Sequence, residues 1–396
     1  MPDRKISSKT VPYRFLIIGA GFSGCVLARE LAERLDCQVD IWDERDHPGG
    51  NCHTERDAET GVMVHRYGPH IFNTDKKEIW DYVNRFSPLM PYIHRVKGMS
   101  NNELYSLPVN LNTINQFFRT NLSSKEAEQL IAQKADKTIG EPENFEEQAL
   151  KFIGPELYRA FFYGYTKKQW GCEPAELPAS ILQRIPIRFD YNDNYHLYPY
   201  TGIPLHGYTA VMKAMINHPS ISLHLNRKFE SANAAGNYQH IFYTGAIDAY
   251  FGYRFGRLGY RTVMFEKQVA TGDHQGVTQI NYCDEAVPYT RITEHKHFAP
   301  WEQHDKTVYF TEYSKETGAG DVPYYPKRLK ADKVLLQQYR ALAEELQGIS
   351  FLGRLATYRY MDMHHVIDEA ISFSDSFIRA LQQNRKPEVF PNTEKN

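Results

Sequence analysis

The stretch Phe15-Leu16-Ile17-Ile18-Gly19-Ala20-Gly21-Phe22-Ser23-Gly24 decides the fold of this 396-residue chain. Four consecutive apolar residues are typical of a parallel strand that is buried on both faces. The three glycines then follow the spacing G-x-G-x-x-G of a turn that binds a dinucleotide. Gly19 permits the tight turn, Gly21 lets the backbone approach a pyrophosphate, and Gly24 allows close packing of helix against strand.

The residues that surround this turn fit a βαβ unit. Residues 25–35 place apolar side chains at helical spacing, and residues 38–43 read as a second strand. Phe22 and Ser23 therefore open a helix whose N-terminal N–H groups face the phosphates. Asp43 follows Gly24 by about 20 residues, the spacing at which an acid binds a ribose 2′-hydroxyl. The sequence predicts a Rossmann-type dinucleotide site.

A second pair of glycines favours FAD over NAD as the dinucleotide. The run Asp43-Glu44-Arg45-Asp-His-Pro-Gly-Gly50-Asn51 lies just beyond the second strand. It indicates a further close approach of the backbone to an extended cofactor. The run resembles the D/E-x-R-x-x-x-G-G-N signature of the large flavoprotein family that includes amine oxidases and phytoene desaturases. We therefore expect Glu44, Arg45, Gly50 and Asn51 to contact FAD.

Composition and charge restrict the class of protein. The formal net charge of −2 supplies no basic field for nucleic acid. The five cysteines form no C-x-x-C pair, so we expect no disulfide framework and no metal site. The first fourteen residues are mostly polar, and no apolar run approaches the roughly 20 residues of a membrane span. These features predict a cytoplasmic protein without an integral membrane segment.

The rest of the chain divides by periodicity into a helical part and a strand-rich part. Residues 111–170 are mainly helical, with separate helices expected at 145–153 and 155–163, and two prolines and a glycine make 170–178 a loop. Short strands alternate with turns from about residue 188, and helices are expected at 335–346 and 366–381. The fold class is α/β: an FAD-binding Rossmann-type domain with a helical insertion and an antiparallel β-sheet domain. The expected domains are the discontinuous FAD domain (12–90, 205–250 and 345–396), the helical domain (110–178, with a mobile loop to about 187) and the sheet domain (91–109, 188–204 and 251–344).

Six collinear stretches carry a more specific resemblance, which covers nearly the whole chain. Together they are similar to the bacterial type of the UDP-galactopyranose mutase family. The resemblance implies a redox-neutral isomerase that interconverts UDP-galactopyranose and UDP-galactofuranose, within cell-wall or polysaccharide biosynthesis. It also implies that N5 of reduced FAD attacks the anomeric carbon and expels UDP, and that the sugar ring then opens through an iminium. The stretches are Tyr67-Gly-Pro-His-Ile-Phe72, Gly164-Tyr-Thr-Lys-Lys-Gln-Trp-Gly171, Glu176-Leu-Pro-Ala-Ser180, Val287-Pro-Tyr-Thr-Arg-Ile-Thr-Glu-His-Lys296, Pro323-Tyr-Tyr-Pro326 and Gly353-Arg-Leu-Ala-Thr-Tyr-Arg-Tyr-Met-Asp-Met363.

The same resemblance assigns substrate-binding residues. A departing UDP carries negative charge on its pyrophosphate, which calls for cationic and phenolic donors. Arg184 and Arg291 match the two phosphate-binding arginines of the family, and Arg291 is also a catalytic candidate. The loop between residues 170 and 184 is similar to a lid whose closure would exclude water from the iminium. Tyr195, Tyr325 and Tyr360 match phosphate-binding tyrosines, and Phe161, Tyr165, Thr166, Trp170 and Asn281 match residues that hold the uridine and the sugar.

A further group is expected around the flavin. His70 and Arg354 are the remaining catalytic candidates, although nothing in the sequence supports a proton shuttle at His70. Arg354 would favour the anionic reduced flavin and so raise the nucleophilicity of N5. The other residues that match flavin contacts are Ile71, Tyr360, Asp362 and Met363.

Two departures from the family pattern bear on the substrate. Asn73 occupies a position that is usually histidine, and His94 occupies a sugar-contacting position where asparagine is common. Exchange of an amide for an imidazole can alter the preference at sugar hydroxyls. Mutases of UDP-N-acetylgalactosamine or dTDP-fucose therefore remain alternatives to the UDP-galactopyranose enzyme. All of them predict a UDP-sugar or related nucleotide sugar as partner and a homodimer or higher homo-oligomer.

Two alternatives lie outside the mutases. A flavin-dependent oxidase or desaturase of the same superfamily would need an apolar or amine-binding cavity and would leave the arginine and tyrosine motifs unexplained. A non-catalytic nucleotide-sensing module would bind nucleotides regardless of the redox state of the flavin. Turnover of a nucleotide sugar without net redox change distinguishes the mutase from both.

Overall fold

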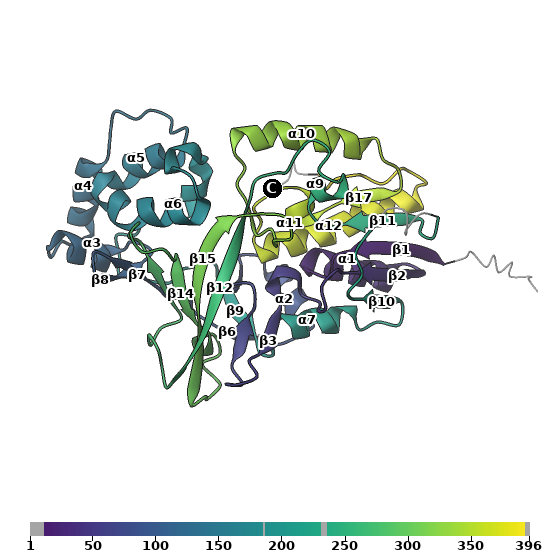
Figure 1. Cartoon of the computed structure of the whole chain (residues 1–396), viewed down its shortest axis with the longest axis horizontal. Coiled ribbons are helices and arrows are strands. Elements are labelled where there is room, and N and C mark those ends of the chain that lie inside the picture. Colours follow the sequence, from purple (N-terminus) through teal and green to yellow (C-terminus); the bar gives the residue numbers. More distant parts are fainter. Residues whose placement is uncertain (1–11, 185–186, 231–235, 393–396) are drawn as a thin grey trace, which may run out of the picture.

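The computed structural model describes residues 12–184, 187–230 and 236–392, with the side chains of 182–184 outside that description. The protein is a mixed α/β structure with several sheets. In Figure 1 the five-stranded sheet and the helices packed on it lie at the right of the view. A separate group of helices, labelled α3 to α6, lies at the left. Between them runs a long ribbon of strands, labelled β12 and β15.

The five-stranded sheet is parallel and has the strand order β10-β2-β1-β11-β17. The predicted buried strand is confirmed, since the last four residues of β1 are buried. Helices α1 and α12 pack side by side against the sheet, and the core that they form with it includes Phe15 and Phe377. The bounds are β1 Tyr13–Ile18, β2 Cys37–Trp42, β10 Ile221–His224, β11 His240–Tyr243, β17 Ile349–Phe351, α1 Phe22–Arg34, α7 Gly207–Ile216, α9 Ile247–Tyr250, α11 Gly353–Ala356 and α12 Met363–Gln382.

A seven-stranded sheet with the order β16-β12-β15-β14-β13-β7-β8 forms the second body of strands. Its pairs are antiparallel except for β13 and β7, which run parallel. This sheet is therefore mixed rather than wholly antiparallel. The bounds are β7 Val96–Ser100, β8 Glu103–Leu107, β12 Tyr260–Thr271, β13 Gln279–Tyr282, β14 Arg291–Glu294, β15 Lys306–Glu316 and β16 Tyr325–Pro326, and α10 spans Lys330–Glu344.

The helical part follows the predicted segments closely. Ser123 and Glu126 form the expected capping box at the start of α4. The two helices expected at 145–153 and 155–163 meet at Gly154, whose φ of 77° breaks the helical path before Pro155. The second of them continues as a π-helical turn, Tyr158–Tyr163. The bounds are α3 Leu111–Phe118, α4 Ser124–Lys134, α5 Phe145–Leu157 and α6 Gly164–Trp170, followed by short 3₁₀ turns at Pro174–Glu176 and Ala179–Arg184.

Two small sheets complete the fold. Strands β3 Thr54–Arg56 and β4 Met63–His65 pair antiparallel. Strand β9, Tyr200–Pro204, pairs with β5 Phe72–Thr74 and β6 Leu89–Pro91 instead of joining the seven-stranded sheet, where residues 188–204 were expected. Helix α2 spans Lys77–Asn84. Among the described residues, no helix combines the length and the apolar character needed to span a bilayer.

Candidate active site

The glycine turn lies at the edge of the parallel sheet where β1, β2 and β11 all end. A Cβ on Gly24 would lie 1.9 Å from the carbonyl oxygen of Gly19, so only glycine permits this approach of helix to strand. Gly19 has a φ of 105°, which favours glycine. Strand order reverses on the two sides of β1, and such a switch point is where open α/β sheets bind ligands.

Asp43 has a structural role beside the ribose contact that its spacing predicts. Its Oδ2 accepts a hydrogen bond from the backbone N–H of Ala20 at 2.7 Å, and its Oδ1 accepts one from Arg45 N at 2.9 Å. The buried carboxylate therefore ties the glycine turn to the end of β2. The neighbouring Glu44 is exposed at the same edge.

A cradle of backbone and cation extends from this turn. A Cβ on Gly50 would lie 3.1 Å from Gly21 Cα, so the two glycine loops pass close to each other. The Arg45 guanidinium lies over the Tyr67 ring and donates to Asn51 Oδ1 at 2.8 Å. Its buried Nη1 has no hydrogen-bond partner within the described part of the chain. A buried cationic donor without a partner fits an anionic group such as a pyrophosphate.

The short helix α11, which carries Arg354, reaches the glycine turn from the far end of the sequence. A Cβ on Gly353 would lie 2.3 Å from Ser23 Oγ. The Arg354 guanidinium lies 4.6 Å from the centre of the Tyr360 ring and 5.2 Å from that of Tyr325. Two of its buried nitrogens, Nε and Nη2, find no partner among the residues that the structure describes. Arg354 is therefore placed to bind an anionic ligand between the two tyrosines.

Arg291 lies at the centre of a row of side chains that crosses the seven-stranded sheet. Asn281 on β13 and Glu312 on β15 are its direct neighbours in register. Arg291 Nε donates to Glu312 Oε2 at 2.7 Å. Burial lowers the pKa of Arg291, but the charge of Glu312 and the Tyr165 and Tyr325 phenols outweigh this effect and raise it well above the ordinary value. Arg291 is thus a permanent cation in a buried site.

A cavity brings together six of the predicted substrate residues. It lies between the helical part and β13, and Phe145, Phe162 and Ile181 contribute apolar lining. Trp170 and Tyr325 are in ring contact, as are Tyr325 and Tyr360, which links the cavity to Arg354. A flat base can pack on the aromatic wall while its phosphates reach Arg291. The predicted residues that line the cavity are Phe161, Tyr165, Thr166, Trp170, Tyr195 and Asn281.

His70 is held as a neutral imidazole between two cations. Its Nδ1 lies 2.7 Å from the Gly68 carbonyl oxygen, which accepts the ring N–H. Burial, together with the charges of Arg354 and Arg291, lowers the pKa of His70 to about 4. At neutral pH the ring therefore presents an acceptor nitrogen and has no proton to donate as an acid.

The two departures from the family pattern take different positions. Asn73 turns its amide back to the Ile71 carbonyl oxygen at 3.1 Å, within β5. His94 is buried, and burial lowers its pKa to about 3. Gln279 contacts the imidazole of His94 and also donates from Nε2 to Asn281 Oδ1 at 2.8 Å. His94 thus belongs to the polar group that surrounds Asn281, whereas Asn73 does not.

For the remaining predicted residues the structure gives a position in the fold, and none of their described side chains lines the cavity. Phe22 packs in the core against Tyr208, so only its backbone N–H at the start of α1 can serve a cofactor. Asp362 precedes the first residue of α12, Met363, and Ile71 is buried beside β5. Arg184 ends the second 3₁₀ turn, and its side chain lies outside the described residues.

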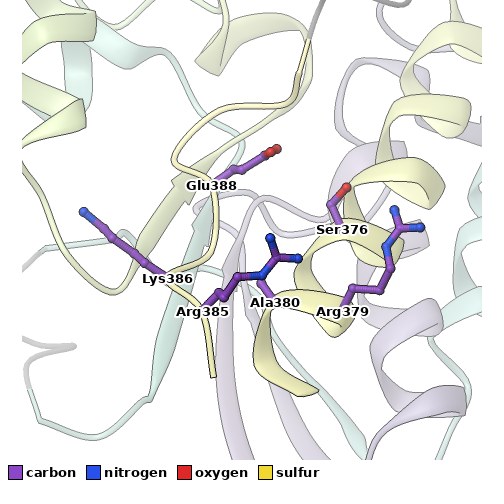
Figure 2. A pocket seen from close by; sticks show the side chains of 6 residues that line it. All are labelled: Ser376, Arg379, Ala380, Arg385, Lys386 and Glu388. Carbon is purple, nitrogen blue, oxygen red and sulfur yellow. The ribbon is translucent and has the colours of Figure 1, made fainter. Parts of the chain in front are cut away.

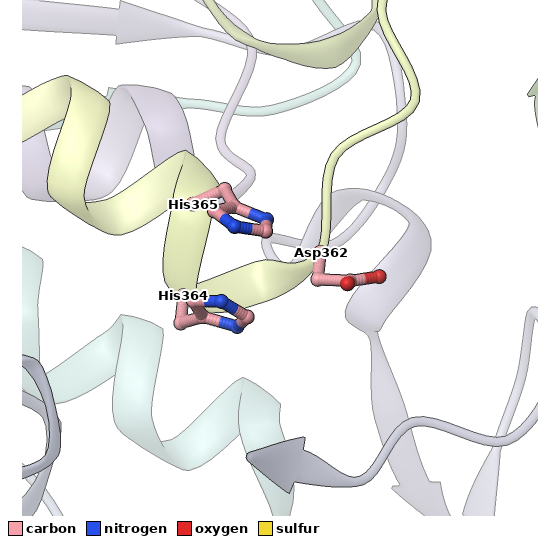
Figure 3. A group of neighbouring side chains, drawn as sticks. All are labelled: Asp362, His364 and His365. Carbon is pink, nitrogen blue, oxygen red and sulfur yellow. The ribbon is translucent and has the colours of Figure 1, made fainter. Parts of the chain in front are cut away.

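Two further side-chain groups lie apart from this cavity. Figure 3 shows Asp362, His364 and His365, whose metal-ligating atoms lie within 4.8 Å of one another. They stand at the N-terminus of α12, where the helix dipole disfavours a cation, and we assign no metal to them.

Figure 2 shows a second cavity, at the end of α12 and the segment that follows; it contains none of the predicted site residues. It is lined by Ser376, Arg379, Ala380, Arg385, Lys386 and Glu388.

Sequence reasoning missed the residues that hold the site in place. Glu312 and Gln279 contact predicted site residues directly. Lys168 donates to a backbone carbonyl at the end of β13, and Arg261 donates to one at the end of α6. Strand pairing brings Gln279, Glu312 and Arg261 to the site, and a single sequence does not reveal the pairing. The alternation of strands β13 and β15 is the one signal that could have placed Gln279 and Glu312 on the face of Arg291.

Comparison with known proteins agrees with this geometry. A family model described as "GLF: UDP-galactopyranose mutase" matches residues 160–360, and an NAD(P)-binding Rossmann-like model matches residues 17–86. A probable UDP-galactopyranose mutase of Klebsiella pneumoniae is 52% identical over 95% of this chain and 97% of its own. A dTDP-fucopyranose mutase of Escherichia coli is 50% identical over 92% of this chain and 98% of its own.

Solved structures share the fold. A reduced UDP-galactopyranose mutase matches with a TM-score of 0.71 at 16% identity, covering 93% of this chain and 96% of its own. A putrescine oxidase matches with a TM-score of 0.59 at 12% identity, covering 93% of this chain and 99% of its own. The fold and site define an isomerase built on a Rossmann-type dinucleotide-binding unit. The chain belongs to the UDP-galactopyranose mutase family.

Proposed function

We propose that this enzyme interconverts UDP-galactopyranose and UDP-galactofuranose without net redox change, with FAD as its cofactor. The observation that carries the proposal is the position of Arg291. It is a largely buried cation that interacts with Tyr165, which lines the aromatic cavity, and with Tyr325, whose ring lies beside Arg354. A nucleoside diphosphate sugar supplies the base, the diphosphate and the hydroxyls that such a site would bind.

The residues around the glycine turn suit FAD. The N-terminus of α1 and the cradle between Gly21 and Gly50 would hold the pyrophosphate, with Arg45 as its cationic partner. We assign the ribose to Glu44, because Asp43 is engaged with backbone N–H groups. Arg354 would lie at the flavin end. When bound and reduced, FAD supplies a nucleophilic N5 for the anomeric carbon.

The chain itself would stabilise the departing diphosphate. Arg291 offers a fixed positive charge, and Tyr325 and Tyr360 offer phenolic donors beside Arg354. Negative charge grows on the leaving diphosphate as the glycosidic bond breaks, so these donors act most strongly in the transition state. His70 would accept a hydrogen bond near the sugar or the flavin, since its pKa of about 4 leaves it neutral.

The segment after Trp170 would cover the bound sugar. Its first part is fixed, because Phe145 N donates to the Leu177 carbonyl oxygen at 2.9 Å. We therefore place the hinge of the proposed lid after Pro178, whose bridge to Asn144 ends the anchored part. Closure would exclude water from reactive sugar species.

The test is a panel of nucleotide sugars. Dithionite-reduced protein is incubated separately with UDP-galactofuranose, UDP-galactopyranose, UDP-N-acetylgalactosamine and dTDP-fucopyranose, and the products are resolved chromatographically. We expect the two UDP-galactoses to interconvert, and the oxidised protein to be inactive. Absence of isomerisation with every sugar would overturn the assignment.

dTDP-fucopyranose is the second candidate substrate. The 50% identical relative from Escherichia coli carries that name, and His94 replaces an amide beside Asn281. A higher kcat/KM with dTDP-fucopyranose than with UDP-galactopyranose in the same panel would select this alternative.

A further inference from the structure

Lys168 occupies an unusual position for a lysine of a short helix. Its Nζ donates to three backbone carbonyl oxygens, those of Tyr282 at 2.8 Å, Asp284 at 2.8 Å and Tyr289 at 3.0 Å. These carbonyls belong to the last residue of β13 and to the connection that follows it to β14. All three ammonium protons are thereby used, and none is directed to a carboxylate or to the cavity.

The connection that Lys168 binds joins the two strands that carry substrate candidates. Asn281 lies on β13 and Arg291 lies on β14. Helix α6 itself carries Tyr165, Thr166 and Trp170, which line the cavity. Lys168 therefore links the proposed nucleoside side of the cavity to its proposed diphosphate side.

Two other contacts fix the same helix. A Cβ on Gly164 would lie 2.4 Å from the Cys283 carbonyl oxygen, so the start of α6 touches the β13–β14 connection directly. At its end, Arg261 on β12 donates to the carbonyl oxygens of Gln169 at 3.0 Å and Lys168 at 3.3 Å. These bonds satisfy carbonyls that a helix C-terminus leaves without partners. Lys168 supplies the middle attachment.

We propose that Lys168 is a positioning residue: its ammonium group holds α6 on the β13–β14 connection and so sets the distance between the nucleoside-binding residues and Arg291. The inference rests on the proposed function only in taking UDP as the ligand. Lys168 does not reach the cavity, so its charge acts through the helix. Loss of that charge would weaken UDP binding more than it slows the chemical step at the sugar.

The charge of Lys168 is sensitive to pH. Burial lowers its pKa to about 8, while Cys283, Asp284 and Glu285 act in the opposite direction. Burial also raises the pKa of the Cys283 thiol to about 12, so this thiol stays neutral near pH 8. The adjacent Lys167 faces away toward Glu173 and Glu285, at 2.7 and 2.9 Å. We therefore expect the attachment to weaken as pH rises past about 8.

The experiment measures UDP binding to the holoenzyme by calorimetry at pH 7, 8 and 9, together with KM and kcat at pH 7. For Lys168→Met we expect the Kd of UDP and the KM to rise about tenfold, with kcat changed less than about threefold. Lys168→Arg should recover part of the affinity. Wild-type affinity should fall from pH 7 to 9, and that fall should be absent in Lys168→Met.

Lys151→Met is the matched control, because Lys151 also donates to a backbone carbonyl, that of Gly140, but away from the cavity. It should bind UDP as the wild type does. Equal KM and Kd in Lys168→Met and wild type, or a pH dependence shared by both, would overturn the inference. If Lys168→Met does not fold, the wild-type pH series and Lys168→Gln decide. Failure of the wild type to bind UDP at pH 7 would instead contradict the proposed function.

Discussion

Arg291 and Glu312 stand directly opposite each other on the antiparallel strands β14 and β15, joined by a 2.7 Å hydrogen bond from Nε to Oε2. The Glu312 side chain is 1% exposed and the Arg291 side chain 15% exposed. Glu312 Oε1 has no partner among the described residues. The pair is therefore a largely buried cation and its counterion.

Removal of the counterion should destabilise the protein. Glu312→Ala leaves the Arg291 charge buried and unpaired, which costs about 3–5 kcal/mol. Urea unfolding monitored by circular dichroism measures the loss. Glu266→Ala on the exposed face of β12 is the control and should stay within about 0.5 kcal/mol of wild type. Equal stability of the two variants would contradict the buried-pair interpretation.

Removal of the cation should affect catalysis rather than cofactor binding. Arg291→Ala should abolish turnover of UDP-galactofuranose while the protein still copurifies with FAD, since Arg45 and the glycine turn lie elsewhere. Flavin absorbance and product chromatography measure the two effects. A colourless Arg291→Ala protein would show that this arginine serves the cofactor.

Substitutions of Asp43 and Glu44 should have different effects, one on the stability of the apoprotein and the other on FAD binding. Asp43→Ala removes the acceptor of two backbone N–H groups and should destabilise the apoprotein by about 1–3 kcal/mol. Glu44→Ala should leave the apoprotein as stable as wild type and raise the Kd of FAD. Thermal unfolding of apoprotein and fluorescence titration with FAD test the pair. The reverse pattern would return the ribose to Asp43.

Buried neutral histidines should make the protein sensitive to acid. Burial lowers the pKa of His240 to about 3, and its ring contacts Ser350 Oγ at 2.9 Å. The unfolded histidine takes up a proton near pH 6.5. Between pH 6.5 and 3 the unfolded state thus binds more protons, and the free energy of unfolding falls as pH decreases.

His240→Gln should remove part of this dependence. At pH 5 the slope of the free energy of unfolding against pH should decrease by about 1.4 kcal/mol per pH unit. Urea unfolding at pH 7.5, 6.5, 5.5 and 5.0 measures it, with His206→Gln, on an exposed side chain, as control. An unchanged slope in His240→Gln would mean that this histidine is protonated in the folded protein.

Local sequence patterns predicted those structural features that depend only on residues close together in the chain. The apolar run before Gly19, the glycine spacing and the capping box at Ser123 each specify backbone geometry within a few residues. The break between the two expected helices at Gly154, just before Pro155, is likewise a local feature of the backbone. The motif stretches likewise indicated the family, because each is a short continuous segment.

Tertiary structure alone decided which side chains meet. Asp43 has the spacing of a ribose acid, and only the fold shows that it also accepts a hydrogen bond from Ala20 N. Glu312 carries no motif, and only the register of β14 against β15 places it on Arg291. The geometry of the glycine turn is a property of its backbone, which the sequence encodes locally. A charged site in a low-dielectric interior depends on counterions from distant strands, and these follow from folding.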